Sequence, residues 1–185
     1  MTEYEKMLAG HWYNPLDAEL RQLRQQSRER CARYNSSGAG HHKQRRLLLA
    51  ELLGSVGQHL FIEPPLFCDY GKHIHVGDNV FFNVNCVLLD VASITIGNNV
   101  FFGPAVQLYT VNHPLDAATR RTGVEQARPI KIGDDVWLGG GVIVCPGVSI
   151  ADRVVVAAGA VVTSDLAADG LYAGNPAKWI KAVNN

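Results

Sequence analysis

The chain has 185 residues, and its 17 Lys and Arg residues balance 17 Asp and Glu residues to a formal net charge of zero. This length predicts one domain that buries about 70% of its unfolded surface. The charge balance argues against a general nucleic-acid-binding protein. No segment approaches the roughly 20 apolar residues of a membrane span, and the N-terminus lacks the pattern of a signal peptide. We therefore expect a cytoplasmic protein whose four cysteines stay reduced: Cys31, Cys68, Cys86 and Cys145.

The N-terminal third is predicted to be helical. Thr2 and Glu5 are spaced as a capping box for a short first helix. Asn14 and Pro15 predict the N-cap and first turn of a second helix, in which leucines recur at helical spacing. A third helix is expected over residues 41–53, and Gly54 ends it.

The rest of the chain carries an internal repeat of six residues. The repeat is clearest in six aliphatic side chains: Ile132, Leu138, Val144, Ile150, Val156 and Val162. The same ladder runs earlier from Val76 to Ile94, slips by two residues and resumes at Ile96. A period of six fits neither a helix nor an uninterrupted strand, but it fits a short strand followed by a turn. The sequence therefore predicts a solenoid of parallel strands around a stacked aliphatic core.

One segment interrupts the repeat. Residues 109–129 lack the period, and long loops on a regular scaffold are often functional. This loop contains the sequence Asn112-His113-Pro114. We divide the chain into a helical cap over residues 1–57 and a solenoid over residues 58–185 that includes this excursion loop and a C-terminal tail.

These patterns resemble the hexapeptide-repeat acyltransferases, and among them the maltose and galactoside O-acetyltransferases. Besides the repeats, the resemblance rests on Tyr13-Asn14-Pro15, Asn112-His113-Pro114 and the closing segment Ala173–Lys178. It implies a mainly β fold: a left-handed parallel β-helix with an N-terminal helical cap and a short C-terminal helix. It also implies a homotrimer with sites between subunits, and an activity that moves an acetyl group from acetyl-CoA to a sugar hydroxyl.

The resemblance makes His113 the candidate catalytic residue. A hydroxyl is a poor nucleophile at neutral pH, so acetyl transfer to it needs a base. Histidine can accept the hydroxyl proton and return it to the departing coenzyme A thiolate. The resemblance implies direct attack without an acyl-enzyme, and the absence of a GxSxG motif is consistent with this. The alternative is that His113 is a loop residue without a task.

Three residues are candidate acceptor contacts. In the resembled family the positions of Asp17, Asp69 and Asn83 line the sugar pocket, where short carboxylate and amide side chains suit hydroxyl groups. Asp17 could instead only interact with a helix dipole, and Asn83 could be a turn residue. Galactoside enzymes carry serine at the position of Asp69, whereas maltose-type enzymes tend to carry aspartate, so a glucosyl or maltosyl acceptor is favoured. Asp90 and Arg24 match only loosely.

The coenzyme A side is predicted from the last coils. The resemblance places five residues along the groove for the pantetheine arm: Trp137, Gly140, Ala158, Thr163 and Ser164. It assigns the backbone N–H of Gly140 to the thioester oxyanion, and Lys178 and Lys181 to the nucleotide phosphates. Trp137 could alternatively pack within a coil, and the two lysines could end a helix. Galactoside enzymes carry serine and lysine at the positions of Gly140 and Ser164. This chain therefore lacks the side-chain contacts that those two residues can make.

Other functions remain open at this point. The acceptor could be a lipo-oligosaccharide signal or a xenobiotic instead of a simple sugar. A metal-dependent lyase like the γ-class carbonic anhydrases would use three histidines as zinc ligands, for which His73, His75 and His113 are the candidates. The ligand pattern of that family is not matched, so no metal is expected. A non-catalytic trimeric scaffold would not need His113 in its loop.

Overall fold

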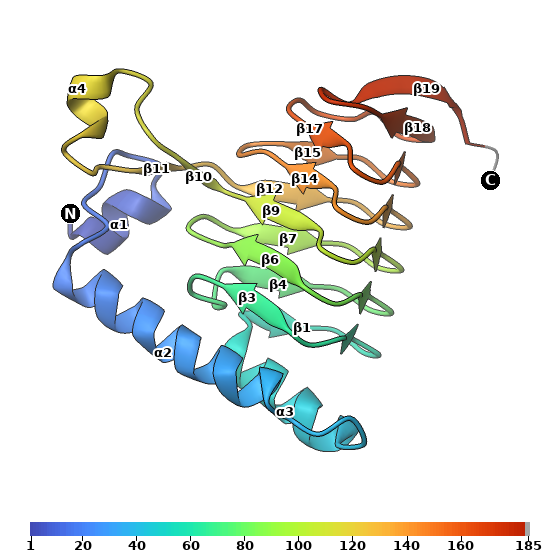
Figure 1. Ribbon diagram of the computed structural model, residues 1–185, viewed down its shortest axis with the longest axis horizontal. Helices are drawn as coiled ribbons and strands as arrows, with labels where there is room; N and C mark the ends of the chain where they lie inside the picture. The colour runs from blue at the N-terminus through green and yellow to red at the C-terminus, as the bar shows by residue number, and fades with distance from the viewer. Residues whose placement is uncertain (184–185) are drawn as a thin grey trace.

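The computed structural model describes residues 1–183 and shows three largely parallel β-sheets wound into a left-handed solenoid, with helices packed at its N-terminal end (Figure 1). Each of the first five coils contributes one strand to each sheet. The solenoid predicted from the six-residue period is therefore confirmed. Among the described residues, no helix is long and apolar enough to cross a membrane.

The helices lie at the N-terminal end and in the excursion loop. They are α1 (Glu3–Leu8), α2 (Ala18–Asn35), α3 (His42–Leu52) and α4 (Ala117–Arg120). The capping box of Thr2 and Glu5 is present as predicted. The predicted start of the second helix is wrong, because Asp17 is the N-cap and its carboxylate accepts the N–H groups of Glu19 and Leu20. The Asn14 side chain instead accepts the N–H of Leu16 in the preceding turn.

The strands form three faces of the solenoid and one hairpin. The first sheet contains β1 (Ser55–Val56), β4 (Ile74–Val76), β7 (Ile94–Ile96), β12 (Ile130–Ile132) and β15 (Ser149–Ile150). The second contains β2 (Phe61–Ile62), β5 (Phe81–Phe82), β8 (Phe101–Phe102), β13 (Trp137–Leu138), β16 (Val155–Val156), β18 (Gly170–Ala173) and β19 (Lys178–Ala182). The third contains β3 (Leu66–Cys68), β6 (Cys86–Leu89), β9 (Gln107–Tyr109), β14 (Ile143–Val144) and β17 (Val161–Val162). The hairpin pairs β10 (Val111–Asn112) with β11 (Gln126–Ala127).

The six-residue ladder forms the core. Val76, Ile96, Ile132 and Ile150 pair in register along the first sheet, and all four are buried. Stacking identical positions in this way gives each aliphatic side chain partners in the coils above and below, which is the packing expected of a solenoid.

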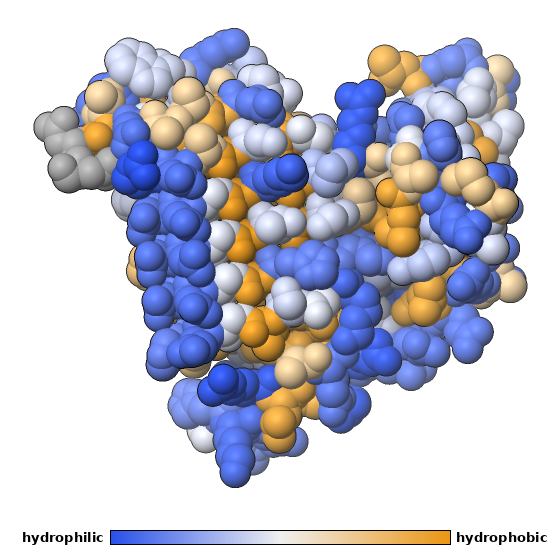
Figure 2. Space-filling view, turned by 180° about the vertical axis from the view of Figure 1, so that it is seen from behind, coloured by the Kyte–Doolittle hydropathy of each residue, from blue (hydrophilic) through white to orange (hydrophobic). Residues whose placement is uncertain are grey.

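The corner between the first and second sheets is polar and regular. Asn79, Asn99, Asp135 and Arg153 occupy the left-handed backbone region there, with φ of 57°, 57°, 58° and 58°. Asparagine and aspartate adopt this region more readily than most residues. Neighbouring coils are joined by side-chain bonds, such as the N–H of Asn98 donating to Asp134 Oδ1 at 2.7 Å. Figure 2, which views the solenoid from behind, shows hydrophilic residues in a column along one edge.

The C-terminal segment departs from the predicted fold. The short C-terminal helix is wrong, because residues 178–182 form β19, which pairs antiparallel with β18. The last coil would otherwise present β18 as an open strand edge, and β19 satisfies the backbone groups of that edge. Pro176 lies in the turn between the two strands, where it cannot continue a helix.

The corner between the third and first sheets is where the repeat lengthens. Regular coils need six positions from one sheet to the next, as from Val144 to Ile150, whereas Leu88 and Ile96 are eight apart. The longest excursion separates Leu108 from Ile132 and holds the hairpin and α4. We call residues 69–73, 90–93 and 110–129 the wide corner. Figure 1 shows its excursion loop beside α1.

Candidate active site

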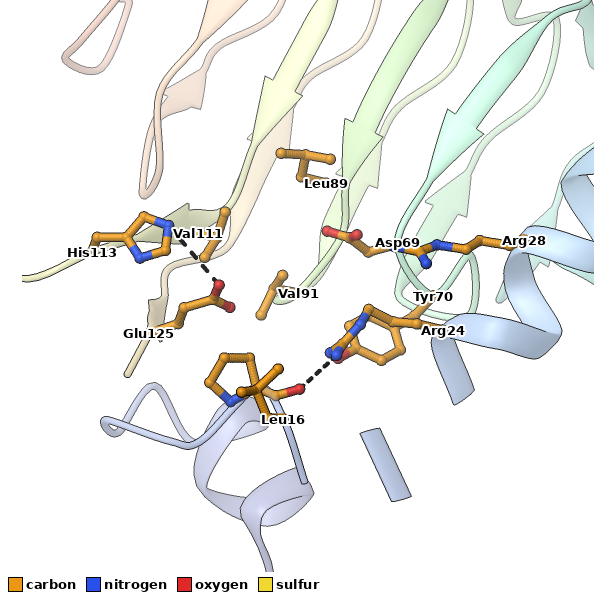
Figure 3. A pocket seen from close by; sticks show the side chains of 11 residues that line it. Leu16, Arg24, Arg28, Asp69, Tyr70, Leu89, Val91, Val111, His113 and Glu125 are labelled. Atoms are coloured by element: carbon orange, nitrogen blue, oxygen red, sulfur yellow. Dashed lines mark hydrogen bonds and ion pairs between the residues drawn. The ribbon is translucent and has the colours of Figure 1, made fainter. Parts of the chain in front are cut away.

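A cavity of about 350 Å³ lies at the wide corner (Figure 3). Its walls come from the segment before α2, from the middle of α2, from the ends of the third-sheet strands and from the hairpin. The lining residues are Pro15, Leu16, Arg24, Arg28, Asp69, Tyr70, Leu89, Val91, Val111, His113 and Glu125. The cavity thus combines two arginines, two carboxylates and a histidine with an aliphatic floor, which suits a small polar molecule that also presents an apolar face.

His113 lies at the rim of this cavity. It follows β10, its side chain is 54% exposed, and its Nε2 atom lies 3.9 Å from Oε1 of Glu125. Glu125 precedes β11, so the antiparallel hairpin is what brings the two side chains together. The Glu125 carboxylate therefore faces the imidazole at the rim of the cavity.

Glu125 is held from its other side by Tyr13. The Tyr13 hydroxyl donates to Glu125 Oε2 at 2.5 Å, and the backbones of the two residues exchange hydrogen bonds of 3.0 and 3.1 Å. Burial, and then the bond to Glu125, raise the pKa of Tyr13, so its hydroxyl remains a donor. The segment before α2 therefore fixes the carboxylate that faces His113.

Asp69 faces the same cavity from the end of β3. Burial raises the pKa of Asp69, and the nearby Arg24 guanidinium opposes that rise. Arg24 itself is fixed, because its guanidinium donates to the Tyr70 hydroxyl at 2.7 Å and to the Pro15 carbonyl at 2.5 Å. Figure 3 shows the Asp69 carboxylate pointing into the cavity, with the Arg28 side chain extending from α2 toward Asp69 on the same side. This wall can accept and donate hydrogen bonds to hydroxyl groups.

The floor of the site rests on the buried side chain of Asp90. Its Oδ1 accepts the N–H groups of Asp69 and Tyr70 at 3.0 and 2.8 Å, and its Oδ2 accepts that of His73 at 3.3 Å. Burial raises the pKa of Asp90 to about 8, against the lowering effect of these backbone donors. Asp90 therefore fixes the backbone that carries Asp69 and does not itself line the cavity.

The remaining candidate zinc ligands serve other contacts. His73 bonds through Nδ1 to the carbonyl of Asp90 at 2.6 Å and through Nε2 to the Tyr4 hydroxyl at 3.1 Å. His75 lies on β4 and bonds to Ser55 at 3.2 Å. Over residues 1–183, no group of three or more His, Cys, Asp or Glu side chains is placed to hold a metal ion.

Comparisons with known proteins identify families and solved structures that are similar to this chain. The model of the maltose acetyltransferase hexapeptide capping motif matches residues 6–57, and that of the bacterial transferase hexapeptide (six repeats) matches residues 129–164. A solved maltose O-acetyltransferase from Clostridium difficile 630 is 44% identical, covering 100% of this chain and 99% of its own, with a TM-score of 0.98. Nodulation protein L of Rhizobium meliloti (strain 1021) is 46% identical over 96% of this chain and 97% of its own. A galactoside acetyltransferase solved in complex with coenzyme A is 33% identical, covering 100% of this chain and 92% of its own, with a TM-score of 0.96.

The chain belongs to the hexapeptide-repeat acetyltransferases of the maltose and galactoside O-acetyltransferase type. The resemblance identified in the sequence is therefore confirmed, as are the left-handed β-helix and its helical N-terminal cap. This acetyltransferase is an enzyme with a cavity at the wide corner, where the six-residue period lengthens in the earlier coils.

The acetyltransferase brings only part of the predicted site together within one chain. His113 and Asp69 line the same cavity, and Asp17 caps α2 immediately beside it. Asn83 lies after β5, at the corner between the second and third sheets. Its side-chain oxygen accepts the N–H of Val84 at 2.8 Å, which is a turn role. One chain therefore does not unite all three predicted acceptor contacts.

The predicted coenzyme A contacts of the acetyltransferase occupy three places. Gly140 and Ala158 lie with Asn83 at the second-to-third corner, and Thr163 and Ser164 follow β17. Among the described residues, the Gly140 N–H donates to no protein acceptor. A Cβ at Gly103 would lie 2.4 Å from that nitrogen, so the close stacking there depends on glycine. The other three predicted contacts are exposed on the second sheet: Trp137, Lys178 and Lys181.

Sequence reasoning missed Glu125, Arg28 and Tyr70, which line the cavity of the candidate site. Glu125 is 12 positions after His113 in a segment without a period, so only the hairpin pairing reveals their contact. A usable signal was present in the two-residue lengthening of the repeat at residues 89–93. That lengthening marks the corner from which the cavity is built.

Proposed function

We propose that this acetyltransferase moves the acetyl group of acetyl-CoA to a hydroxyl of a sugar, with a glucose- or maltose-type acceptor favoured. The observation that carries the proposal is His113, whose Nε2 faces the Glu125 carboxylate at 3.9 Å on the rim of a cavity walled by Asp69, Arg24 and Arg28. Two solved relatives support it, because one is named a maltose O-acetyltransferase and the other holds coenzyme A.

His113 acts as the general base in this proposal. Its Nε2 takes the proton of the acceptor hydroxyl while the hydroxyl oxygen attacks the thioester carbonyl carbon. The tetrahedral intermediate then collapses, the carbon–sulfur bond breaks, and the coenzyme A thiolate takes the proton from His113. Glu125 stabilises the imidazolium formed between these two transfers, and Tyr13 keeps Glu125 in place. No covalent acyl-enzyme is needed.

The acceptor binds through Asp69, with Arg24 and Arg28 as donors from α2. A sugar hydroxyl both donates and accepts, so a carboxylate and guanidinium groups on facing walls can hold it in one orientation. Asp17 contributes by fixing the start of α2. Asn83 belongs to the same site only if another subunit brings its corner against the cavity.

A homotrimer supplies that second corner in our proposal. The outer face of the second sheet is apolar in register, from Phe61 through Phe81 and Phe101 to Trp137. Phe101 and Trp137 remain 53% and 55% exposed in one chain, and a contiguous apolar face of this kind marks an interaction surface. Acetyl-CoA would then lie between subunits, along Trp137, Gly140, Ala158, Thr163 and Ser164, with its phosphates at Lys178 and Lys181.

Thiol release from acetyl-CoA tests the proposal. Glucose, maltose and galactosides are compared as acceptors, with His113→Ala as the test variant and His75→Ala as the matched histidine control. We expect sugar-dependent release that falls roughly 10²–10⁴-fold in His113→Ala and is unchanged in His75→Ala. Equal rates in His113→Ala and the wild type would refute the base. Acetyl-CoA binding without release to any sugar would refute the sugar acceptor while leaving the family assignment in place.

A further inference from the structure

Two of the four cysteines meet between the helical cap and the solenoid. Cys31 lies on α2 and is 6% exposed, and Cys68 is the last residue of β3. Their Sγ atoms are 3.4 Å apart, and Ser27, one turn earlier on α2, places its Oγ 3.5 Å from the Cys68 sulfur. The sulfurs are thus in contact without being bonded, since a disulfide bond is about 2.05 Å long.

The pair lies beside a cavity, although Cys31 itself is buried. A second cavity, of about 420 Å³, lies between α2 and the third sheet, and both cysteines line it. Arg28 and Phe67 stand in the same wall, so a reagent that enters meets a cation beside the thiols. The thiolate is the nucleophilic form of cysteine. A nearby positive charge favours the thiolate, so partly accessible cysteines beside a cation are the reactive ones.

The two thiols differ in acidity. The hydrogen bond from Cys68 lowers the pKa of Cys31, and burial opposes this effect. The bond to Cys31, together with burial, raises the pKa of Cys68. Cys31 is therefore the thiol that ionises first, and Cys68 lies in contact with it as the second sulfur.

The other two cysteines provide a contrast within the same chain. Cys86 is buried, donates to the carbonyl of Asn83 at 3.2 Å, and has its pKa raised to about 11 by burial. Burial also raises the pKa of Cys145. Within the described residues, neither has a second sulfur as a hydrogen-bond partner. Of the four cysteines, only Cys31 and Cys68 are therefore placed to form a disulfide bond with one another.

We propose that Cys31 and Cys68 form an oxidisable dithiol site that reacts with low-molecular-weight disulfides of the glutathione type. The Cys31 thiolate attacks one sulfur of the reagent, so the reagent's S–S bond breaks and one thiol leaves with the Cys31 proton. Cys68 then attacks the Cys31 sulfur of the mixed disulfide, and the second thiol leaves with the Cys68 proton. The protein is oxidised by two electrons, and the reagent is reduced to two thiols.

The location gives this modification a consequence for the acceptor site. Both cavities share Arg28, Asp69 and Leu89 as walls, and Asp69 directly follows Cys68. Bringing the sulfurs from 3.4 Å to bonding distance draws α2 toward β3 and narrows the space between Arg28 and Asp69. Oxidation is therefore expected to raise the KM for the sugar at least threefold and to leave the KM for acetyl-CoA unchanged. This last expectation rests on the proposed function.

The test treats the full-length protein with oxidised glutathione and reads the intact mass and the free thiols under denaturing conditions. We expect a loss of two hydrogen atoms, a fall from four free thiols to two, and a peptide that joins residues 31 and 68. Cys31→Ser and Cys68→Ser should not show this change, and Cys145→Ser should show it in full. The oxidised protein should also melt several degrees higher, since the bond closes a long loop.

Several outcomes overturn the proposal. They are four unreacted thiols at an excess of reagent, a disulfide that involves Cys86 or Cys145, or covalent dimers in place of the internal bond. If Cys68→Ser fails to fold, Cys31→Ser and Cys31→Ala test the same bond from the α2 side. The mass and thiol readings do not require turnover, so they remain decisive even if no sugar is acetylated.

Discussion

The coils over residues 130–162 and the wide corner are built from the same chain by different packing rules. In the regular coils six residues carry the chain from one sheet to the next, and Leu138, Val144 and Val156 are fully buried. The wide corner inserts extra residues, and there the buried side chains include Asp90 and Thr110. Where the period holds, side chains serve the core. Where the period lengthens, the extra residues form the walls of a cavity.

Removing the excursion should cause the largest loss of activity. Replacing residues 113–125 with Asn-Gly joins β10 to β11 through the two-residue turn that an antiparallel hairpin favours. Because His113 and Glu125 are removed together, we expect activity to fall at least as far as in His113→Ala, by about 10²–10⁴-fold. Circular dichroism should remain that of the wild type. Loss of the β signal would mean that the loop is also needed for folding.

A core substitution in a regular coil should show the opposite pattern. Leu138→Ala removes a fully buried side chain and should lower the free energy of unfolding by about 2–5 kcal/mol. Below its melting temperature, its kcat should stay within a few-fold of the wild-type value. Denaturant unfolding at fixed protein concentration, with kinetics at low temperature, measures both. A variant with unchanged stability would contradict the role given to the ladder.

Glu125→Gln separates positioning from proton transfer. The amide oxygen can still accept from Tyr13, but the variant loses the charge that, in our proposal, stabilises the imidazolium. We expect kcat to fall about tenfold, which corresponds to ~1.4 kcal/mol, with the KM for acetyl-CoA unchanged. Tyr13→Phe should have a smaller effect, because the backbone pairing between Tyr13 and Glu125 remains. If Glu125→Gln left kcat and its pH profile unchanged, Glu125 would have no part in the reaction.

Asp90 predicts a pH dependence of stability. Its pKa of about 8 in the folded protein lies above the ordinary value of about 3.9, so the folded chain keeps a proton that the unfolded chain releases between these limits. Stability should therefore fall as pH rises from about 4 to 8, by at most ~1.4 kcal/mol per pH unit. Asp90→Asn removes this contribution. Urea unfolding of both proteins at pH 5.5 and 7.5 should show the wild type losing stability relative to the variant, and parallel curves would contradict this.

Much of the fold could be predicted from the sequence, because a solenoid repeats one local rule. The positions from Ile132 to Val162 predicted both the strands and the core. The errors fall at chain ends and caps. The third residue after Asn14, Asp17, caps α2 in its place, and β18 recruits the tail as a strand. Both outcomes depend on which group becomes the hydrogen-bond partner of a backbone N–H or C=O. Local composition does not determine that partner.

The site could be predicted only as far as single residues matched the family. His113 and Asp69 were predicted and share the cavity. The contact of His113 with Glu125 depends on hairpin register, and the contact of Cys31 with Cys68 depends on how α2 lies against β3. Such contacts between distant segments leave no spacing signal in the sequence. The contacts predicted for Asn83 and Gly140 stay predictions, because both residues lie at another corner of the same chain.

Hydrogen–deuterium exchange with bound acceptor tests the central claim most directly, that acceptor binding belongs to the wide corner. The His113→Ala protein is used with saturating maltose, so that bound sugar is not consumed. The account predicts slower exchange at residues 69–71, 89–92 and 111–113, and unchanged exchange across residues 143–156. Protection confined to residues 143–156, with none at the wide corner, would contradict it.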